Sequence, residues 1–145
     1  MASDPLNATT CDELVDHFEE CHKKAYLCPA GVPTIGRGST GWDVAMGMTW
    51  TQAQCDARSE LDIARARNFA ARNSKNLTGI KLEATADFCY NVGNGAYRAS
   101  TLRQRINSGD LADVPTQLRR WVRGGGRVLR GLARRREAEV TMWLR

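Results

Sequence analysis

The amino-acid sequence predicts a mostly helical α+β fold of one domain, with a small sheet lobe near the N-terminus and a larger helical lobe after it. Helix-capping residues precede stretches whose apolar residues recur every three or four positions, the period of a helix with one buried face. One segment, 26–41, combines prolines and glycines with short β-prone pieces, which is typical of tight turns between strands. A length of 145 residues is enough for one domain to bury a full core.

The first helix is expected over residues 11–20. Thr10 and Glu13 have the spacing of a capping box, in which each side chain satisfies a free backbone N–H at the helix start. Apolar residues then follow at helical spacing. Glu19 is therefore placed in the last turn of this helix.

The segment 26–41 is expected to form a small twisted sheet. Its β-prone pieces include Val32 and the pair Thr34-Ile35. Cys28 would lie where the chain enters the sheet, and Thr34 would lie on a strand inside it.

A long helix follows the sheet. Thr51 and Gln54 form a second capping box, and the helical period continues to about Arg72. Such a helix can join two lobes, so we divide the domain 1–145 into a β-containing lobe with a cleft, a connecting helix, and a helical lobe with the first helix packed near the cleft. These parts span about residues 22–50, 51–73 and 74–145.

Shorter helices complete the chain, each with a capping or breaking residue at its ends. In chain order they are Thr78 to Gly93, Ser100 to Gly109, the segment opened by Asp113 and Pro115 that holds Trp121, and Gly131 to Leu144. Gly124-Gly125-Gly126 separates the last two.

The net charge of +5 is unevenly distributed. Residues 1–97 carry 9 basic and 12 acidic side chains, a balance of −3, whereas residues 98–145 carry 12 arginines and 4 acids, a balance of +8. The C-terminal third would attract a polyanion. However, the sequence has no helix-turn-helix, zinc or RNP-type pattern, and aromatic residues are only 7%, so specific nucleic-acid binding is not expected.

Five cysteines, an odd number without metal-type spacing, are typical of free thiols in a reducing compartment. No metal site is expected. Cys21 and Cys28 flank the turn from helix to sheet and would make a redox-sensitive disulfide if they approached each other. The N-terminus has no secretory-signal pattern, and no apolar run reaches the roughly 20 residues of a membrane span, so the sequence predicts a cytoplasmic protein.

Residues 18–40 place a glutamate, a thiol and a hydroxyl at fixed intervals, Glu19, Cys28 and Thr34, within FEECHKKAYLCPAGVPTIGRGST. Two later stretches are NVGNG, from Asn91, and GLARRREAE, which ends at Glu139. Together these motifs resemble the phage-type lysozymes, the T4-like and lambdoid endolysins of glycoside hydrolase family 24, over nearly the whole chain.

The resemblance implies a lysozyme-like fold and a monomeric, cofactor-free endolysin that hydrolyses the β-1,4 bond between N-acetylmuramic acid and N-acetylglucosamine in peptidoglycan. Glu19 would be the general acid, since a carboxylate at a helix C-terminus faces the negative end of the dipole, which favours its neutral form. Cys28 and Thr34 would place the attacking water on the opposite face, so that the reaction inverts the anomeric centre.

Each of these three residues has an alternative role. Glu19 alone would be read as a solvated surface side chain, Cys28 as a small buried hydrophobe, and Thr34 as a β-branched residue that packs a strand. A single carboxylate also leaves open a lytic transglycosylase, in which the muramyl 6-hydroxyl attacks and an anhydro end forms. A non-catalytic glycan-binding module on the same fold is a further alternative.

The resemblance also suggests substrate-binding residues. Tyr90, Asn91 and Thr101 match positions near the far wall of the cleft, although Asn91 could instead join Trp121 in a buried polar contact between helices. Arg37 stands where the family has tyrosine and could bind peptide carboxylates of the wall polymer.

Two further departures from the family pattern lie close by, since Glu20 replaces a glycine and Ser39 a histidine. The run Arg134-Arg135-Arg136 is expected to be a solvated helix face paired with Glu137 or Glu139, or a surface that docks on the anionic cell envelope. As an endolysin without a recognisable signal, the protein would stay in the host cytoplasm until a separate holin-type pore released it to the wall or periplasm.

Overall fold

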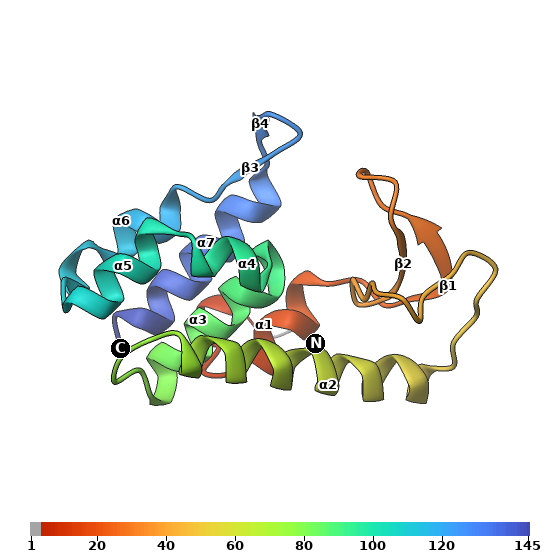
Figure 1. Ribbon diagram of the computed structural model, residues 1–145, viewed down its shortest axis with the longest axis horizontal. Coiled ribbons are helices and arrows are strands. Elements are labelled where there is room, and N and C mark those ends of the chain that lie inside the picture. Colours follow the sequence, from red (N-terminus) through yellow and green to blue (C-terminus); the bar gives the residue numbers. More distant parts are fainter. Residues whose placement is uncertain (1–3) are drawn as a thin grey trace.

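The computed structural model describes residues 4–145, in which a two-stranded sheet lies at one end, most of the helices gather at the other, and a short hairpin projects from the helical part (Figure 1). The long helix α2 runs below both parts and connects them. The elements are η1 (Pro5–Asn7), α1 (Cys11–Phe18), β1 (His22–Leu27), β2 (Pro33–Gly36), α2 (Gln52–Arg72), α3 (Gly79–Val92), α4 (Asn94–Arg98), α5 (Thr101–Ser108), η2 (Leu111–Asp113), α6 (Val114–Arg119), β3 (Arg123–Gly124), β4 (Arg127–Val128) and α7 (Arg130–Trp143).

Helix α1 begins as predicted but ends two residues earlier. The Thr10 hydroxyl accepts a hydrogen bond from the Glu13 N–H at 3.2 Å, so Thr10 caps the helix. The Glu19 N–H still donates to the Val15 carbonyl, but Glu19 itself has extended backbone angles and leads into β1. The predicted end at residue 20 was wrong because the chain must extend at once to reach the sheet.

Strands β1 and β2 form an antiparallel pair in which Tyr26 lies opposite Thr34. Thr34 lies on a strand, as predicted, but the sheet begins at His22 rather than at Tyr26. Cys28 follows β1 in the turn to β2, so its predicted place at the entry to the sheet was wrong. Because successive side chains alternate between the faces of a strand, the Tyr26–Thr34 pairing puts both side chains on one face.

Helix α2 connects the small sheet to the helical lobe. Its N-terminus has the complete capping box that the sequence predicts: the hydroxyl of Thr51 accepts from the Gln54 N–H, and the Gln54 side chain accepts from the Thr51 N–H. Its buried residues are spaced by three or four positions, which gives the helix one inward face. They are Cys55, Ser59, Ile63, Ala66 and Ala70.

The core of the helical lobe is built around α3. Phe88 is fully buried and makes edge-on contacts with the rings of Tyr97, on α4, and Trp121. Trp121 lies beyond the end of α6 and not within a helix, which corrects the prediction, because its ring packs on Phe88 instead of continuing the helical stripe. Helix α4 lies in a stretch that the sequence left unassigned.

The start of α3 and the glycine segment 124–126 differ from expectation in detail. Thr78 precedes α3, but its side chain makes no capping hydrogen bond; the next residue, Gly79, has a φ of +62°. The glycines at 124–126 interrupt the chain as predicted, but they do so within the β3–β4 hairpin. Gly125 and Gly126 both have positive φ, the geometry of a two-residue hairpin turn.

Replacing Phe88 with alanine is expected to destabilise the protein by about 3–5 kcal/mol, because the substitution opens a cavity beneath Tyr97 and Trp121. Urea unfolding followed by far-UV circular dichroism measures this loss. The control is Leu61→Ala, since Leu61 is 46% exposed and its removal should change the free energy of unfolding by less than about 0.5 kcal/mol. Equal losses in the two variants would contradict this assignment of the core.

Candidate active site

Glu19 lies at the junction between α1 and the sheet, and its side chain is 22% exposed. One carboxylate oxygen accepts a hydrogen bond from the Arg135 guanidinium at 2.6 Å. The other oxygen borders Gly38, where a β-carbon would lie 3.5 Å from it. The carboxylate is therefore held from the helical lobe on one side and open toward the loop after β2 on the other.

Arg135 is the residue that fixes Glu19. It comes from α7, is 3% exposed, and donates two further hydrogen bonds, at 2.9 and 2.7 Å, to both oxygens of the fully buried Asp87 on α3. Its guanidinium also lies over the Phe18 ring, 5.5 Å from the centroid. A planar guanidinium bound by two carboxylates in this way has little freedom, so α7 and α3 together position Glu19.

Arg136 forms a second buried ion pair, with Glu139 of the same helix at 2.7 Å. It also donates to the Asn91 side-chain oxygen at 2.7 Å and, more weakly, to the Trp121 carbonyl at 3.4 Å. Asn91 and Trp121 are thus joined through Arg136. Burial, the largest effect, raises the pKa of Glu139 well above its usual range.

The arginine run therefore differs from its predicted solvated face. Arg135 and Arg136 are buried, and only Arg134 is exposed. The expected pairing of the run with Glu139 is present, but it is formed inside the protein. The C-terminal third consequently presents fewer charges to solvent than its sequence suggests.

Tyr26 and Thr34 lie opposite each other on the small sheet, and Cys28 lies in the turn that follows β1. A hydrogen bond from the Val32 backbone is the main reason that the pKa of the Cys28 thiol lies below its ordinary value, with smaller contributions from its neighbours, including the Thr34 hydroxyl. Thr34 is buried, and its hydroxyl donates to the Val32 carbonyl at 2.9 Å. The single Thr34 proton can serve either this carbonyl or the sulfur.

The Tyr26 phenol is affected by the charges of both Glu19 and Cys28. Burial, the largest effect, raises the pKa of the Tyr26 phenol, and the nearby negative charges of Glu19 and Cys28 raise it further. Tyr26 therefore lies within electrostatic reach of both. The structure brings Cys28 and Thr34 together, because the Cys28 N–H and the Thr34 hydroxyl both donate to the Val32 carbonyl, whereas Glu19 is held by Arg135.

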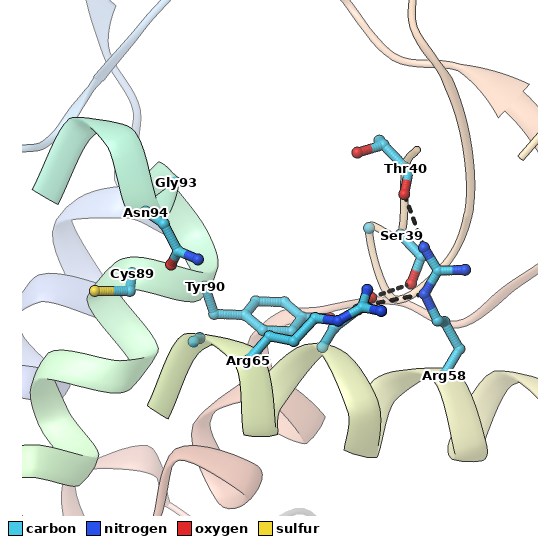
Figure 2. Close-up of a pocket in the computed structure, with 11 residues that line it drawn as sticks. Ser39, Thr40, Arg58, Arg65, Cys89, Tyr90, Gly93 and Asn94 are labelled. Atoms are coloured by element: carbon cyan, nitrogen blue, oxygen red, sulfur yellow. Dashed lines mark hydrogen bonds and ion pairs between the residues drawn. The ribbon is translucent and has the colours of Figure 1, made fainter. Parts of the chain in front are cut away.

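Gly38, next to the Glu19 carboxylate, also lines a polar pocket of about 240 Å³. Glu19, Cys28 and Thr34 are not among the residues that line it. Figure 2 shows the loop after β2 on one side, α3 with the start of α4 on the other, and α2 beneath. Its lining residues are Gly38, Ser39, Thr40, Arg58, Asp62, Arg65, Ala66, Cys89, Tyr90, Gly93 and Asn94. Ser39 donates to Asp62 at 2.6 Å, so the serine that replaces the family histidine ties the loop to α2.

The predicted substrate-binding residues lie in different places. Tyr90 lines the pocket, and its hydroxyl donates to the Arg37 carbonyl at 2.5 Å. The Arg37 side chain lines a separate acidic hollow, where it pairs with Asp56 at 2.9 Å and with Asp16 at 3.8 Å. Thr101 is the first residue of α5 and is not among the residues that line the pocket.

The other residues that the sequence singled out are also placed. Glu20 has an 86% exposed side chain that lies 3.4 Å from His22, so it does not point into the site. All five cysteines are free thiols. Cys21 accepts a hydrogen bond from the Gln52 side chain at 3.9 Å. Burial, and to a lesser extent the neighbouring Cys21, raises the pKa of Cys55 to about 11.

Comparison with known proteins shows the family of this chain. Residues 16–139 match the phage lysozyme family. The chain belongs to the phage lysozyme family. A relative, the SAR-endolysin of Bacteriophage PS119, is 39% identical over 131 residues, which cover 88% of this chain and 78% of that protein.

Solved structures of this kind share the fold. The muramidase domain of SpmX from Asticaccaulis excentricus superposes with a TM-score of 0.82 at 26% identity, covering 93% of this chain and 95% of that one. The active form of the P1 phage endolysin Lyz gives 0.78 at 27% identity, covering 95% and 86%. The predicted lysozyme-like α+β fold is confirmed.

Sequence reasoning missed three residues of this phage lysozyme site. Arg135 and Asp87 hold the carboxylate of Glu19, and the charges of Glu19 and Cys28 both raise the pKa of Tyr26. A signal for Tyr26 was present, because it lies within the motif two residues before Cys28. Arg135 was hidden in a run of three arginines, where only burial distinguishes its members.

Two negative findings hold for residues 4–145. No group of three or more histidine, cysteine, aspartate or glutamate side chains is placed to hold a metal ion. No helix in the same part of the chain is both long and apolar enough to cross a membrane.

The Cys28 thiol is expected to ionise below the ordinary cysteine pKa of about 8.5, because backbone N–H groups and Thr34 favour the thiolate. The pH dependence of iodoacetamide labelling, read at Cys28 by peptide mass spectrometry, measures this value. Thr34→Val removes one donor at similar volume and should move the midpoint upward. A wild-type midpoint at or above 8.5 would contradict the expected lowering.

Arg135→Met should lower the free energy of unfolding by about 3–5 kcal/mol, because it leaves Asp87 buried without its cation. Arg134→Met is the matched control and should change the free energy of unfolding by less than about 0.5 kcal/mol, since Arg134 is exposed. Chemical denaturation of the three proteins at pH 7 gives both values.

The loss of stability in Arg135→Met is expected to depend on pH. Burial alone raises the pKa of Asp87, but Arg135 outweighs burial and holds it below its usual value, so the wild type keeps this stabilisation above about pH 4. In Arg135→Met the Asp87 pKa should rise instead, and protonation should relieve the cost at low pH. The difference from wild type should therefore shrink between pH 7 and pH 4; a constant difference would argue against Asp87 as its source.

Proposed function

We propose that this phage lysozyme hydrolyses the β-1,4 bond between N-acetylmuramic acid and N-acetylglucosamine in peptidoglycan, and so lyses the host cell. One observation carries the proposal: the Glu19 carboxylate is fixed by Arg135 and lies against Gly38, which lines a polar pocket. The names of related proteins, among them endolysins and a muramidase domain, support the same class of reaction.

In the proposed mechanism Glu19 protonates the leaving glycosidic oxygen. The Asp87–Arg135 pair holds the carboxyl group in place, which removes the cost of orienting it in each turnover. Positive charge then develops at the anomeric carbon. The Cys28 sulfur, with its lowered pKa, would stabilise this charge as thiolate.

The attacking water would be placed by Thr34 and Cys28. The Thr34 hydroxyl both donates and accepts hydrogen bonds, so it can orient a water while the sulfur accepts one of its protons. Attack from the face opposite Glu19 would invert the anomeric configuration. No cofactor takes part in this scheme.

The pocket beside Gly38 would hold part of the glycan strand. Tyr90 lines it directly, whereas Asn91 and Arg37 are bound to other protein groups and would act on substrate only through the shape of the site. The proposed contact of Thr101 with substrate would lie outside this pocket.

The proposed physiological setting follows from the same reaction. The enzyme would act as a monomer on the wall after release from the host cytoplasm, with a separate holin-type protein for passage. Exposed arginines of the β3–β4 hairpin and the start of α7 would bind the anionic cell envelope without sequence-specific nucleic-acid recognition. They are Arg123, Arg127, Arg130 and Arg134.

A lytic transglycosylase remains the second candidate, because Glu19 is the one carboxylate that the motif supplies. The two reactions differ in product. Hydrolysis leaves an ordinary reducing end on the muramic acid, whereas intramolecular attack by its 6-hydroxyl leaves an anhydro end.

Mass spectrometry of products from purified peptidoglycan distinguishes these functions. The wild type should release fragments with reducing ends, and Glu19→Gln should lower the rate at least a hundredfold, since an amide cannot donate the required proton. Glu20→Gln is the matched control and should keep the wild-type rate, because Glu20 is 86% exposed and points away.

Two results would overturn the proposal. Anhydro ends would make the enzyme a transglycosylase. The absence of any Glu19-dependent product would leave a glycan-binding module.

A further inference from the structure

Trp42 has a fully solvent-exposed indole, with a side chain 98% accessible. The other three tryptophans are at least partly buried, and Trp143 is only 3% exposed. An indole in water leaves a large apolar surface uncovered, which favours contact with a ligand when one is present. Nothing in the proposed reaction so far uses this residue.

The turn that carries Trp42 is firmly held. Arg58, on α2, donates to the Thr40 carbonyl at 2.8 Å and forms an ion pair with Asp43 at 2.8 Å, so it holds the chain on both sides of Trp42. The Val44 N–H closes the turn by donating to the Gly41 carbonyl at 3.1 Å, and the Val44 side chain is buried. The indole is thus presented on a fixed support, which lowers the entropy cost of binding.

Trp42 follows a pocket-lining residue closely in the chain. Thr40 and Arg58 both line it, and Figure 2 shows the bond between them at the edge of the cavity. Trp42 is two residues beyond Thr40, so their Cα atoms lie within about 7 Å. Along this loop Gly38 borders Glu19, Thr40 borders the pocket, and Trp42 follows outside it.

We propose that Trp42 is a sugar-binding residue that stacks on the glycan strand where it leaves the pocket. This inference rests on the proposed function. The apolar C–H face of a pyranose matches an indole face, while the hydroxyl and N-acetyl groups match the polar lining supplied by Ser39, Asp62 and Asn94. Trp42 would thereby set the length of glycan that the enzyme binds best.

A lipid surface is the competing partner. Met46 and Met48, in the same loop, are 52% and 37% exposed and would add to a membrane contact. The continuity with the polar pocket favours sugar.

The test measures binding in a Glu19→Gln background, so that the ligand is not consumed. Peptide-free glycan strands of defined length are titrated by calorimetry into this protein and into versions with Trp42→Ala or Trp42→Phe. Trp42→Ala should weaken binding of long strands about tenfold, about 1.4 kcal/mol, and leave the shortest strands unaffected. Trp42→Phe should restore most of the affinity, because it keeps an aromatic face.

Leu111→Ala is the control for loss of an exposed apolar side chain, since Leu111 is 43% exposed and lies outside the pocket. It should bind strands of every length as the parent does. In active enzyme, Trp42→Ala should raise KM for long strands with kcat unchanged, as expected for a contact equally strong in the ground and transition states.

Three results would overturn the inference. Trp42→Ala could bind long strands as tightly as its parent, or lose affinity equally at every length. Alternatively, Trp42→Ala could weaken binding to vesicles of equal parts phosphatidylglycerol and phosphatidylethanolamine without weakening binding to glycans. Trp42 would then be a membrane contact. If wild-type enzyme still digests peptidoglycan in these cases, the proposed function stands and only the role of Trp42 fails.

Discussion

The ion-paired chain Asp87–Arg135–Glu19 is the interaction on which the site depends. Asp87 is fully buried, and a buried carboxylate costs several kcal/mol unless a cation and hydrogen bonds compensate it. Arg135 supplies both and has one more N–H group directed at Glu19. The helical core therefore does two things at once: it neutralises its own buried charge, and it fixes a carboxylate at the edge of the small sheet.

Cys28 and Thr34 are held by backbone hydrogen bonds and strand pairing rather than by an ion pair. Cys28 lies in a turn, where backbone N–H groups that no strand partner occupies can point at the sulfur and lower its pKa. Thr34, opposite Tyr26 in the ladder, is held by strand pairing. A buried ion pair thus fixes Glu19, whereas a short β-turn and strand pairing fix Cys28 and Thr34.

Much of this arrangement could be predicted from the sequence where the signal is local. The capping box at Thr51, the left-handed end at Gly109 and the strand at Thr34 depend on neighbouring residues and were found. The sequence did not predict where Trp121 lies, or that Arg135 and Arg136 are buried. The partners Phe88 of Trp121 and Asp87 of Arg135 are far away in the chain, and the Arg136–Glu139 pair, although local, gives no sign that it is buried. Three adjacent arginines look alike until a core surrounds two of them.

The contact between Arg135 and Glu19 joins residues 116 positions apart. Bringing such distant segments together is slow, because the entropy of a large loop must be lost before the contact forms. During synthesis, a nascent chain that lacks α7 would hold Glu19 without its partner. An enzyme directed against the wall of the cell that makes it would thus be assembled only after the last helix has left the ribosome.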